Sequence, residues 1–196
     1  ELTAQVCISK STISLDYSKL ASRIIISNNH KNTSPSFSET IHILYNNVDK
    51  TTNLKNSLIS DSVYNIVMNN KQKLNDIINY DRDYTFDYFS FKTLEKAYLL
   101  KSNGKVVERI QHMFLRVSLG LYGDNIKDAI NSYNAMSQKY FIHATPTLYN
   151  SGTKSNQLAS CFLLGTNDSI TGIFKTIGDC AEISKWAGGI GLHVSN

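Results

Sequence analysis

The stretch "NQLASCFLLGTNDSITGIFKTIGDCAEISKWAGGIGLHVSN", residues 156–196, decides the fold class of this chain. Within it "LASCFLL" (158–164) is a short apolar run between turns, which predicts a buried strand. A helix capped by Asp168 is predicted to follow and to end near Trp186, at the glycine pair Gly188–Gly189. Its apolar stripe consists of Ile170, Ile173, Phe174, Ile177 and Ala181. "IGLHV" (190–194) predicts a second strand, and strand, helix and strand in this order indicate the start of an α/β unit.

The residues before this stretch predict helices. Residues 1–30 have helical spacing of apolar side chains, and a helix is expected to start after the break at Pro35. "FSETIHILYNNV" (37–48) predicts a short helix, with a loop over 46–56. Residues 58–80 predict one helix, or two with a break near residues 69–70.

A hairpin and two more helices complete the predicted helical domain. In "YLLKSNGKVVER" (98–109), Asn103–Gly104 predicts a tight turn because both residues can take positive φ. Helices are predicted over 109–122 and 124–141, the second capped by Asp124. The predicted fold is therefore α/β overall, with a mainly helical domain over 34–141 that contains one hairpin. The α/β part begins at residue 142.

Composition and charge exclude several classes of protein. The chain has 196 residues, of which 41% are hydrophobic and 18% charged, and its net charge is +4 with the basic residues scattered. Neither a nucleic acid polymer nor a membrane surface is indicated as a partner, and no apolar run reaches the roughly 18 residues of a membrane helix. The three cysteines show no metal-ligand spacing, so no metal site is predicted, and their odd number suggests a reducing compartment. A first residue Glu1 suggests a piece of a longer chain.

The motifs of residues 142–196 each allow a structural and a functional interpretation. "GGIGLHV" (188–194) is not a dinucleotide fingerprint, because its glycines follow a helix and open a strand. Gly188 and Gly189 can be a helix stop or a place where backbone N–H groups approach an anion. Cys161 can be an inert core cysteine or a reactive thiol. Asp168 and Thr145 can be no more than a helix cap and a turn residue.

Several stretches together resemble one family. They are "LASRIIISNNHKNT" (20–33), "IINYDRDYTFDYFSFKTLEKAYLL" (77–100), "GKVVERIQHMFLRVSLG" (104–120), "HATPTLYNSGT" (143–153), "QLASCFLL" (157–164) and the stretch from Asp168 to Asn196. In this order they resemble the large, catalytic subunit of class I ribonucleotide reductases of the eukaryotic and viral type. The resemblance implies that residues 142–196 begin a ten-stranded α/β barrel and that residues 1–33 are the trailing end of an ATP-cone region.

The same resemblance implies roles for nine residues. Cys161 is expected to be one of two redox-active cysteines that form a disulfide as the ribose of a nucleoside diphosphate is reduced. The residues expected to hold the substrate are Thr145, Ser160, Gly188 and Gly189. The residues expected to bind an allosteric effector, ATP or a deoxynucleoside triphosphate, at a dimer interface are Asp168, Ser169, Ile170 and Lys185. The helix between these sites would act as a lever.

The resemblance also implies partners and further parts. It implies a homodimer of large subunits in the cytoplasm, a small subunit whose di-metal centre supplies the radical, and electrons from thioredoxin or glutaredoxin. The radical cysteine, the partner of Cys161 and a carboxylate for proton transfer are expected after Asn196, so this piece alone should be inactive. Two alternatives remain: a module that binds effector and dimerises without chemistry, and a helical interaction scaffold.

Overall fold

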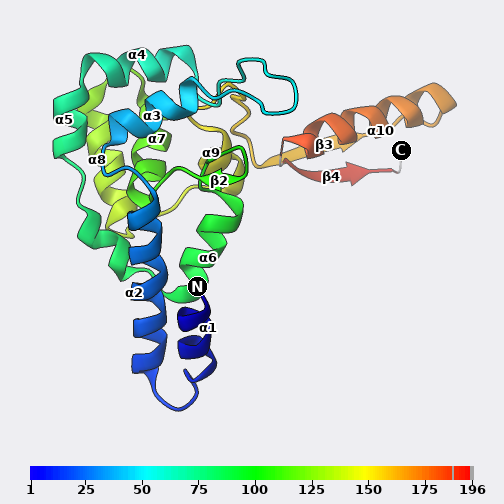
Figure 1. The fold of residues 1–196 in the computed structure, drawn as a ribbon. Helices are drawn as coiled ribbons and strands as arrows, with labels where there is room; N and C mark the ends of the chain where they lie inside the picture. Colours follow the sequence, from blue (N-terminus) through cyan, green and yellow to red (C-terminus); the bar gives the residue numbers. More distant parts are fainter. Residues whose placement is uncertain (187, 195–196) are drawn as a thin grey trace.

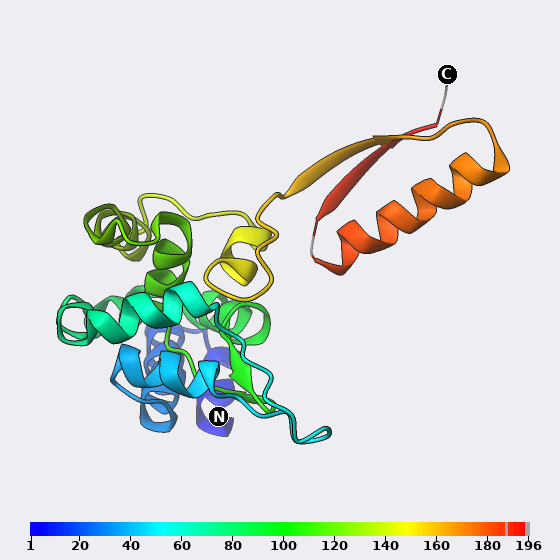
Figure 2. The same ribbon diagram turned by 90° about the horizontal axis from the view of Figure 1, so that it is seen from above.

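The computed structural model describes residues 1–186 and 188–194, and it has two parts. A helical body contains the first nine α-helices and a small hairpin, and a unit of two strands and one helix projects from it (Figure 1). Figure 2 shows the same separation from above, so the projection is visible in both views. The α/β fold with a mainly helical first part is thereby confirmed.

The chain order of the elements follows the predicted pattern closely. The helices are α1 (Leu2–Ser9), α2 (Leu15–Asn32), α3 (Phe37–Tyr45), α4 (Asp61–Asn69), α5 (Lys71–Asp76), the 3-10 helix η1 (Tyr80–Thr85), α6 (Tyr88–Ala97), α7 (Ile110–Tyr122), α8 (Ile126–Ser137), α9 (Thr145–Asn150) and α10 (Ile170–Lys185). The strands are β1 (Lys101–Ser102), β2 (Lys105–Val106), β3 (Cys161–Gly165) and β4 (Gly189–His193). The predicted break near residues 69–70 is confirmed, because α4 and α5 meet at Asn70.

Helix α7 is the centre of the body. Every residue from Ile110 to Leu119 is buried, including polar ones, as expected for a helix surrounded by other elements. It packs most extensively against α8 and also contacts α9, η1 and α4. The side chains of α2, α3 and α6 add to the same continuous core through residues such as Ile26, Phe37 and Phe91.

A buried ion pair joins α7 to α9 and the turn after it. Arg116 Nε donates to Glu108 Oε1 at 2.6 Å, and both side chains are fully buried. The same guanidinium donates to the carbonyl of Ser151 at 2.6 Å, just after the end of α9. Gly152 follows with φ +78°, and a Cβ there would lie 2.8 Å from the carbonyl oxygen of Arg116. Only a glycine fits this contact without strain, so the turn sits directly on α7.

The predicted hairpin is confirmed. Asn103 and Gly104 have φ of 50° and 80°, the left-handed values of a two-residue hairpin turn, and β1 pairs antiparallel with β2. The side chain of Asn103 also donates to the carbonyl of Val48 at 3.0 Å. The hairpin therefore holds the long loop that follows α3.

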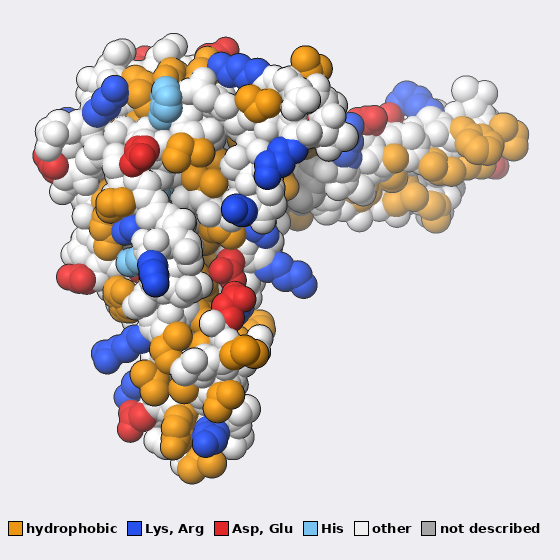
Figure 3. All heavy atoms as spheres, viewed as in Figure 1, with side chains coloured by type: hydrophobic (Ala, Val, Ile, Leu, Met, Phe, Trp, Pro, Cys, Tyr) orange, Lys and Arg blue, Asp and Glu red, His pale blue; other side chains and the backbone are white. Residues whose placement is uncertain are grey.

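The projecting unit is a parallel β–α–β arrangement. β3 pairs with β4 in parallel, with Cys161 beside Gly189 and Gly165 beside His193, and α10 forms the crossover between them. Exposed apolar side chains gather along this unit, orange in Figure 3, and at the α1–α2 end of the body. The most exposed in the unit are Leu163, Ile170, Val194, Phe174 and Ile177.

Four details of the sequence prediction are wrong. Residues 1–30 do not form one helix, because a turn over 10–13 separates α1 from α2. Asn125, not Asp124, caps α8, with its side chain accepting the N–H of Asp128. Residues 145–150 form a helix, although Thr145 and Pro146 predicted a turn. The strand over 161–165 exists but is not buried, since alternate residues are exposed and Leu163 is 91% exposed.

Candidate functional site

Three of the four residues expected at the substrate site meet where β3 and β4 begin. Cys161 is the first residue of β3 and lies opposite Gly189, the first residue of β4. The N–H of Gly189 donates to the carbonyl of Ser160 at 2.7 Å, and Gly188 precedes it directly. Parallel pairing thus brings Ser160, Cys161 and the glycine pair to one edge of the sheet, although 27 positions separate Cys161 from Gly188 in the sequence.

Cys161 is an exposed free thiol. The interpretation as an inert core cysteine is therefore wrong for this residue in the described structure. Cys7, on α1, is buried in the core of the body, as that interpretation expects. Cys180 is half-buried on α10. An exposed thiol is accessible to a substrate or a redox partner, whereas a buried one is not.

The glycine pair lies where the helix stop was predicted and also serves close packing. The N–H of Gly188 bonds the carbonyl of Ile183 in the last turn of α10, so it helps to close the helix. A Cβ on Gly188 would lie 2.6 Å from Ile183 Cγ2, which leaves no room for a side chain.

The backbone N–H groups of this pair are also already bonded. Gly188 N–H donates to the carbonyl of Ile183 at 3.1 Å, and Gly189 N–H donates to Ser160. The expectation that amides at this turn are free to hold phosphate is therefore wrong. What Gly189 offers a ligand is an accessible backbone surface, because this residue is exposed and carries no side chain.

Thr145 belongs to the helical body. It is the first residue of α9, it is exposed, and its hydroxyl hydrogen-bonds the phenol oxygen of Tyr98 on α6 at 2.9 Å. α9 reaches the strand unit through Thr147, whose hydroxyl donates to the carbonyl of Leu158 at 3.2 Å. Thr145 thus faces α6, and no hydrogen bond among the described residues joins it to Ser160, Cys161 or the glycine pair.

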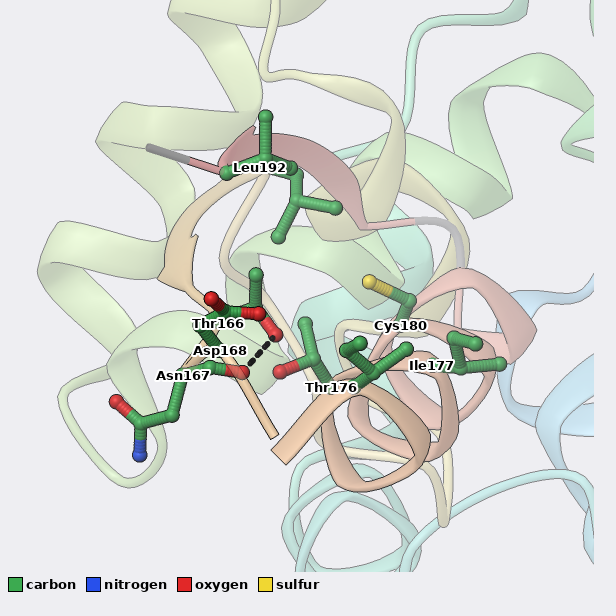
Figure 4. Close-up of a pocket in the computed structure, with 9 residues that line it drawn as sticks. Thr166, Asn167, Asp168, Thr176, Ile177, Cys180 and Leu192 are labelled. Carbon is green, nitrogen blue, oxygen red and sulfur yellow. Dashed lines mark hydrogen bonds between the residues drawn. The ribbon is translucent and has the colours of Figure 1, made fainter. Parts of the chain in front are cut away.

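A cavity of about 660 Å³ lies at the opposite end of the strand unit. Figure 4 shows that the loop after β3 contributes Asp168, α10 contributes Thr176 and Cys180, and β4 contributes Leu192. The remaining walls are Thr166, Asn167, Ile173, Ile177 and Val194. The lining is mostly apolar with a few polar groups at the rim, as in sites that hold small organic ligands.

The start of α10 is capped by Ser169 rather than by Asp168. The hydroxyl of Ser169 accepts the N–H of Gly172 at 3.0 Å, so the predicted capping role of Asp168 is wrong. The carboxylate of Asp168 is exposed and lines the cavity beside this helix start. Ile170 follows, with 73% of its surface exposed.

Lys185 lies far from the other three residues expected to bind effector. It is the last residue of α10, and its ammonium group lies 5.5 Å from the centre of the Trp186 ring. Ile170 and Lys185 are the two ends of the helix, which at 1.5 Å per residue puts them roughly 22 Å apart. Within one chain the structure does not bring Lys185 together with Asp168.

Two residues of the inner cavity wall were not among the predicted site residues. Thr176 and Cys180 lie four residues apart on α10, next to the apolar stripe, and Thr176 is 8% exposed with its hydroxyl bonded to the carbonyl of Gly172. Their i, i+4 spacing places both side chains on one face of the helix, and this was the signal in the sequence that they line one surface. In residues 1–186 and 188–194, no three His, Cys, Asp or Glu side chains converge as metal ligands would. None of the helices in the described part of the chain has the length and apolar composition to span a bilayer.

A helical body followed by a parallel strand–helix–strand unit, with an exposed thiol at the start of its first strand, is the arrangement expected from the family that the sequence resembles. Comparison with known families agrees. Residues 84–156 match the all-alpha domain of ribonucleotide reductase, and residues 159–196 match its barrel domain. The chain belongs to the ribonucleotide reductase large-subunit family.

Individual relatives support the same membership. Over its whole length the chain is 50% identical to the ribonucleoside-diphosphate reductase large chain 2 of Saccharomyces cerevisiae, covering 23% of that protein. It is 51% identical to the large subunit of Arabidopsis thaliana, covering 24% of it, and 49% identical to that of Variola virus, covering 25%. The chain therefore spans about a quarter of the length of these relatives.

Proposed function

We propose that this chain is the part of a ribonucleoside-diphosphate reductase large subunit that supplies one redox thiol and portions of the substrate and effector sites. The observation that carries the proposal is the position of Cys161, exposed at the start of β3 beside Ser160 and Gly189. The substrate would be a ribonucleoside diphosphate and the product the corresponding deoxyribonucleoside diphosphate. The chain alone, covering about a quarter of its relatives, would be inactive.

In this reaction Cys161 acts as half of a dithiol. Two thiols that join as a disulfide release two electrons and two protons, which is what replacing the ribose 2′-hydroxyl by hydrogen with loss of water requires. The second cysteine and the radical cysteine would come from other parts of the subunit. A di-metal small subunit would supply the radical, and thioredoxin or glutaredoxin would reduce the disulfide after each turnover.

The neighbours of Cys161 would orient the substrate. Ser160 and Thr145 offer hydroxyl groups, which can donate to phosphate or ribose oxygens. Gly189 would let the nucleotide pass close to the backbone, since it is exposed and carries no side chain, and Gly188, packed against Ile183 and Phe162, would hold this backbone in place. Their N–H groups are bonded within the protein, so we do not assign them as phosphate donors.

The other end of α10 would bind the allosteric effector, ATP or a deoxynucleoside triphosphate. Asp168 would accept a hydrogen bond from a sugar hydroxyl, because a carboxylate repels phosphates. Ser169 and Ile170 would contact the same ligand from the start of the helix. Because Lys185 is a helix length away, its positive charge would serve the effector of a second copy in a homodimer whose α10 helices run antiparallel.

Replacing Cys161 by serine in the complete protein tests the redox assignment. We expect the variant to lose multiple-turnover reduction while its effector affinity stays unchanged, since the thiol lies at the other end of the unit from Asp168. Cys7→Ser and Cys180→Ser are the controls and should retain turnover. Normal steady-state reduction by the Cys161→Ser variant would refute the assignment.

A second candidate function is an effector-binding and dimerisation module without chemistry. It is favoured by the exposed apolar stripe of α10 and by the cavity at the start of that helix. Effector binding and dimerisation by a complete protein that reduces no diphosphate would support it. The division into an ATP-cone end (1–33), a helical domain (34–141) and a barrel start (142–196), and the cytoplasmic location, stay predictions.

A further inference from the structure

Side-chain hydrogen bonds from α9 connect the body to the strand unit. α9 packs against α7, and from α9 the side chains of Thr147 and Asn150 reach across to the strand unit. The hydroxyl of Thr147 donates to the carbonyl of Leu158, in the segment that precedes β3. Asn150, the last residue of α9, reaches both that segment and the far end of α10.

The amide of Asn150 serves two carbonyl groups from distant parts of the chain. Its Nδ2 lies 2.7 Å from the carbonyl oxygen of Gln157 and 3.4 Å from that of Trp186. The residue is 1% exposed. A side-chain NH₂ group has two hydrogens, so one asparagine can donate to both carbonyls at once.

This amide is not needed for the local turn. The turn after α9 is closed by the main-chain carbonyl of Asn150, which accepts the N–H of Thr153 at 3.0 Å and its hydroxyl at 2.7 Å. Those bonds would survive removal of the side chain. The two hydrogen bonds of Nδ2 instead join residues 7 and 36 positions apart in the sequence, so they are tertiary contacts; together they are called the Asn150 tie.

The helix that carries Asn150 is itself fixed. Arg116 donates to the carbonyls of Leu148 and Ser151 on either side of it, and the hydroxyl of Ser151 donates to the carbonyl of Val117 on α7 at 2.9 Å. Asn150 therefore reaches out from a rigid base.

We propose that Asn150 is a positioning residue, whose amide holds the end of α10 at Trp186 and the approach to β3 at Gln157 in register with α9. Trp186 is two positions before Gly188, and Gln157 is three before Ser160. The tie therefore fixes Thr145, at the start of α9, relative to the glycine pair and Cys161. The link to substrate rests on the proposed function, whereas the tie itself is structural.

The test uses the complete protein and the variants Asn150→Ala and Asn150→Asp. Asn150→Asp keeps the shape of the side chain but replaces the NH₂ group, and with it both hydrogen-bond donors, by an oxygen. This variant replaces Asn150→Ala in the test if the alanine variant does not accumulate. Asn29→Ala is the matched control: Asn29 is also buried and its Nδ2 also donates to a main-chain carbonyl, that of Glu108, but deep in the body.

Hydrogen exchange gives a readout independent of activity. We expect the amides of Gly188 and Gly189 to exchange about three- to tenfold faster in both Asn150 variants, the effect of losing about one net hydrogen bond. In Asn29→Ala these amides should exchange as in the unsubstituted protein. Unchanged exchange at Gly188 and Gly189 in the Asn150 variants would overturn the proposal.

Binding measurements separate positioning from general weakening. The dissociation constant of a ribonucleoside diphosphate should rise about three- to tenfold in the Asn150 variants, while that of a deoxynucleoside triphosphate changes less than about twofold. Equal losses of diphosphate affinity in the Asn150 and Asn29 variants would overturn the positioning role. A failure of the unsubstituted protein to bind diphosphate would count against the proposed function. The hydrogen-exchange result would still show whether Asn150 holds α10 and the approach to β3 in place.

Discussion

At the scale of single residues, His112 shows how the body keeps a titratable group neutral. Its Nδ1 lies 3.5 Å from the backbone nitrogen of Arg109, whose N–H it accepts, so the proton of the neutral ring is on Nε2. Nε2 lies 2.7 Å from the phenol oxygen of Tyr80, which in turn donates to the carbonyl of Pro35. Burial, with a smaller contribution from the Arg109 guanidinium, lowers the pKa of His112 to about 3.

We predict that His112 makes the body less stable in acid. Its folded pKa is depressed below the usual value near 6.5, so between about pH 6.5 and pH 3 the unfolded chain binds a proton that the folded chain does not. The free energy of unfolding should therefore fall as the pH falls through this window, by up to about 1.4 kcal/mol per pH unit from this group. Urea titrations at pH 7.5, 6 and 5 measure the slope.

A matched pair of variants isolates the contribution of His112. His112→Gln keeps a polar group but cannot titrate, so its urea midpoint should vary less with pH than that of the unsubstituted chain. His42→Gln makes the same change at an exposed position and should leave the pH dependence as it was. An identical slope in all three proteins would show that His112 does not control acid stability.

Residue-scale predictions succeeded where the signal was strictly local. Asn103–Gly104 gave the hairpin because positive φ at two successive positions is a property of those residues themselves. The helix cap at the start of α10 was missed by one position, because Asp168 and Ser169 are both good caps and sequence alone does not choose between them. In the structure the hydroxyl of Ser169 accepts the N–H of Gly172, so Ser169 is the cap.

At the scale of elements, the buried pair of Arg116 and Glu108 organises three segments. Glu108 Oε2 accepts the N–H of Leu100 at 2.9 Å, next to the hairpin, while Arg116 holds the carbonyls at the end of α9. The pair thus connects the hairpin, α7 and α9. Both charged groups are removed from water, and the cost of their desolvation is offset by their attraction for each other.

Replacing Arg116 by methionine should destabilise the chain by about 3–5 kcal/mol, because the carboxylate of Glu108 would stay buried without its cation. Replacing both residues, as Glu108→Gln with Arg116→Met, should cost less than Arg116→Met alone. Lys175→Met breaks an exposed pair with Asp179 and should have no measurable effect. Urea unfolding measures all three, and a small loss in Arg116→Met would contradict the buried-pair argument.

The same pair explains why α9 forms although its sequence does not predict a helix. α9 is six residues long, begins after Ala144 without a side-chain cap, and contains Pro146 in its first turn. A segment so short has little helical stability of its own. The helix exists because Arg116 and Ser151 fix its end on α7, and those contacts come from residues 35 and 34 positions away.

At the scale of the whole molecule, the projecting unit exposes the apolar stripe of α10. Ile170 is 73% exposed, Phe174 67% and Ile177 57%, and this surface runs along the helix for its first half. Exposed apolar patches of this kind mark interaction surfaces. Under the proposed function the occupant is the α10 helix of a second large subunit.

We predict that Phe174→Asp weakens dimerisation of the complete protein. Burying a phenylalanine contributes about 1.5–3 kcal/mol, so losing it and adding a charge should raise the dimer dissociation constant at least about tenfold. Thr171→Asp adds the same charge at an exposed polar position on the same helix and should change it less. Sedimentation velocity measures both, and equal dimerisation of Phe174→Asp and the unsubstituted protein would refute the interface.

The sequence by itself determined what depends on neighbouring residues: helical periodicity, the hairpin, the break at Asn70, the strand–helix–strand order and, by resemblance, the family. Tertiary structure decided what depends on groups far apart in the chain. In the folded chain the N–H of Gly189 donates to the carbonyl of Ser160, Cys161 is exposed, and Lys185 lies a helix length from Asp168. These outcomes follow from strand pairing, close packing and helix length, and no local pattern specifies which distant carbonyl or side chain a residue will meet.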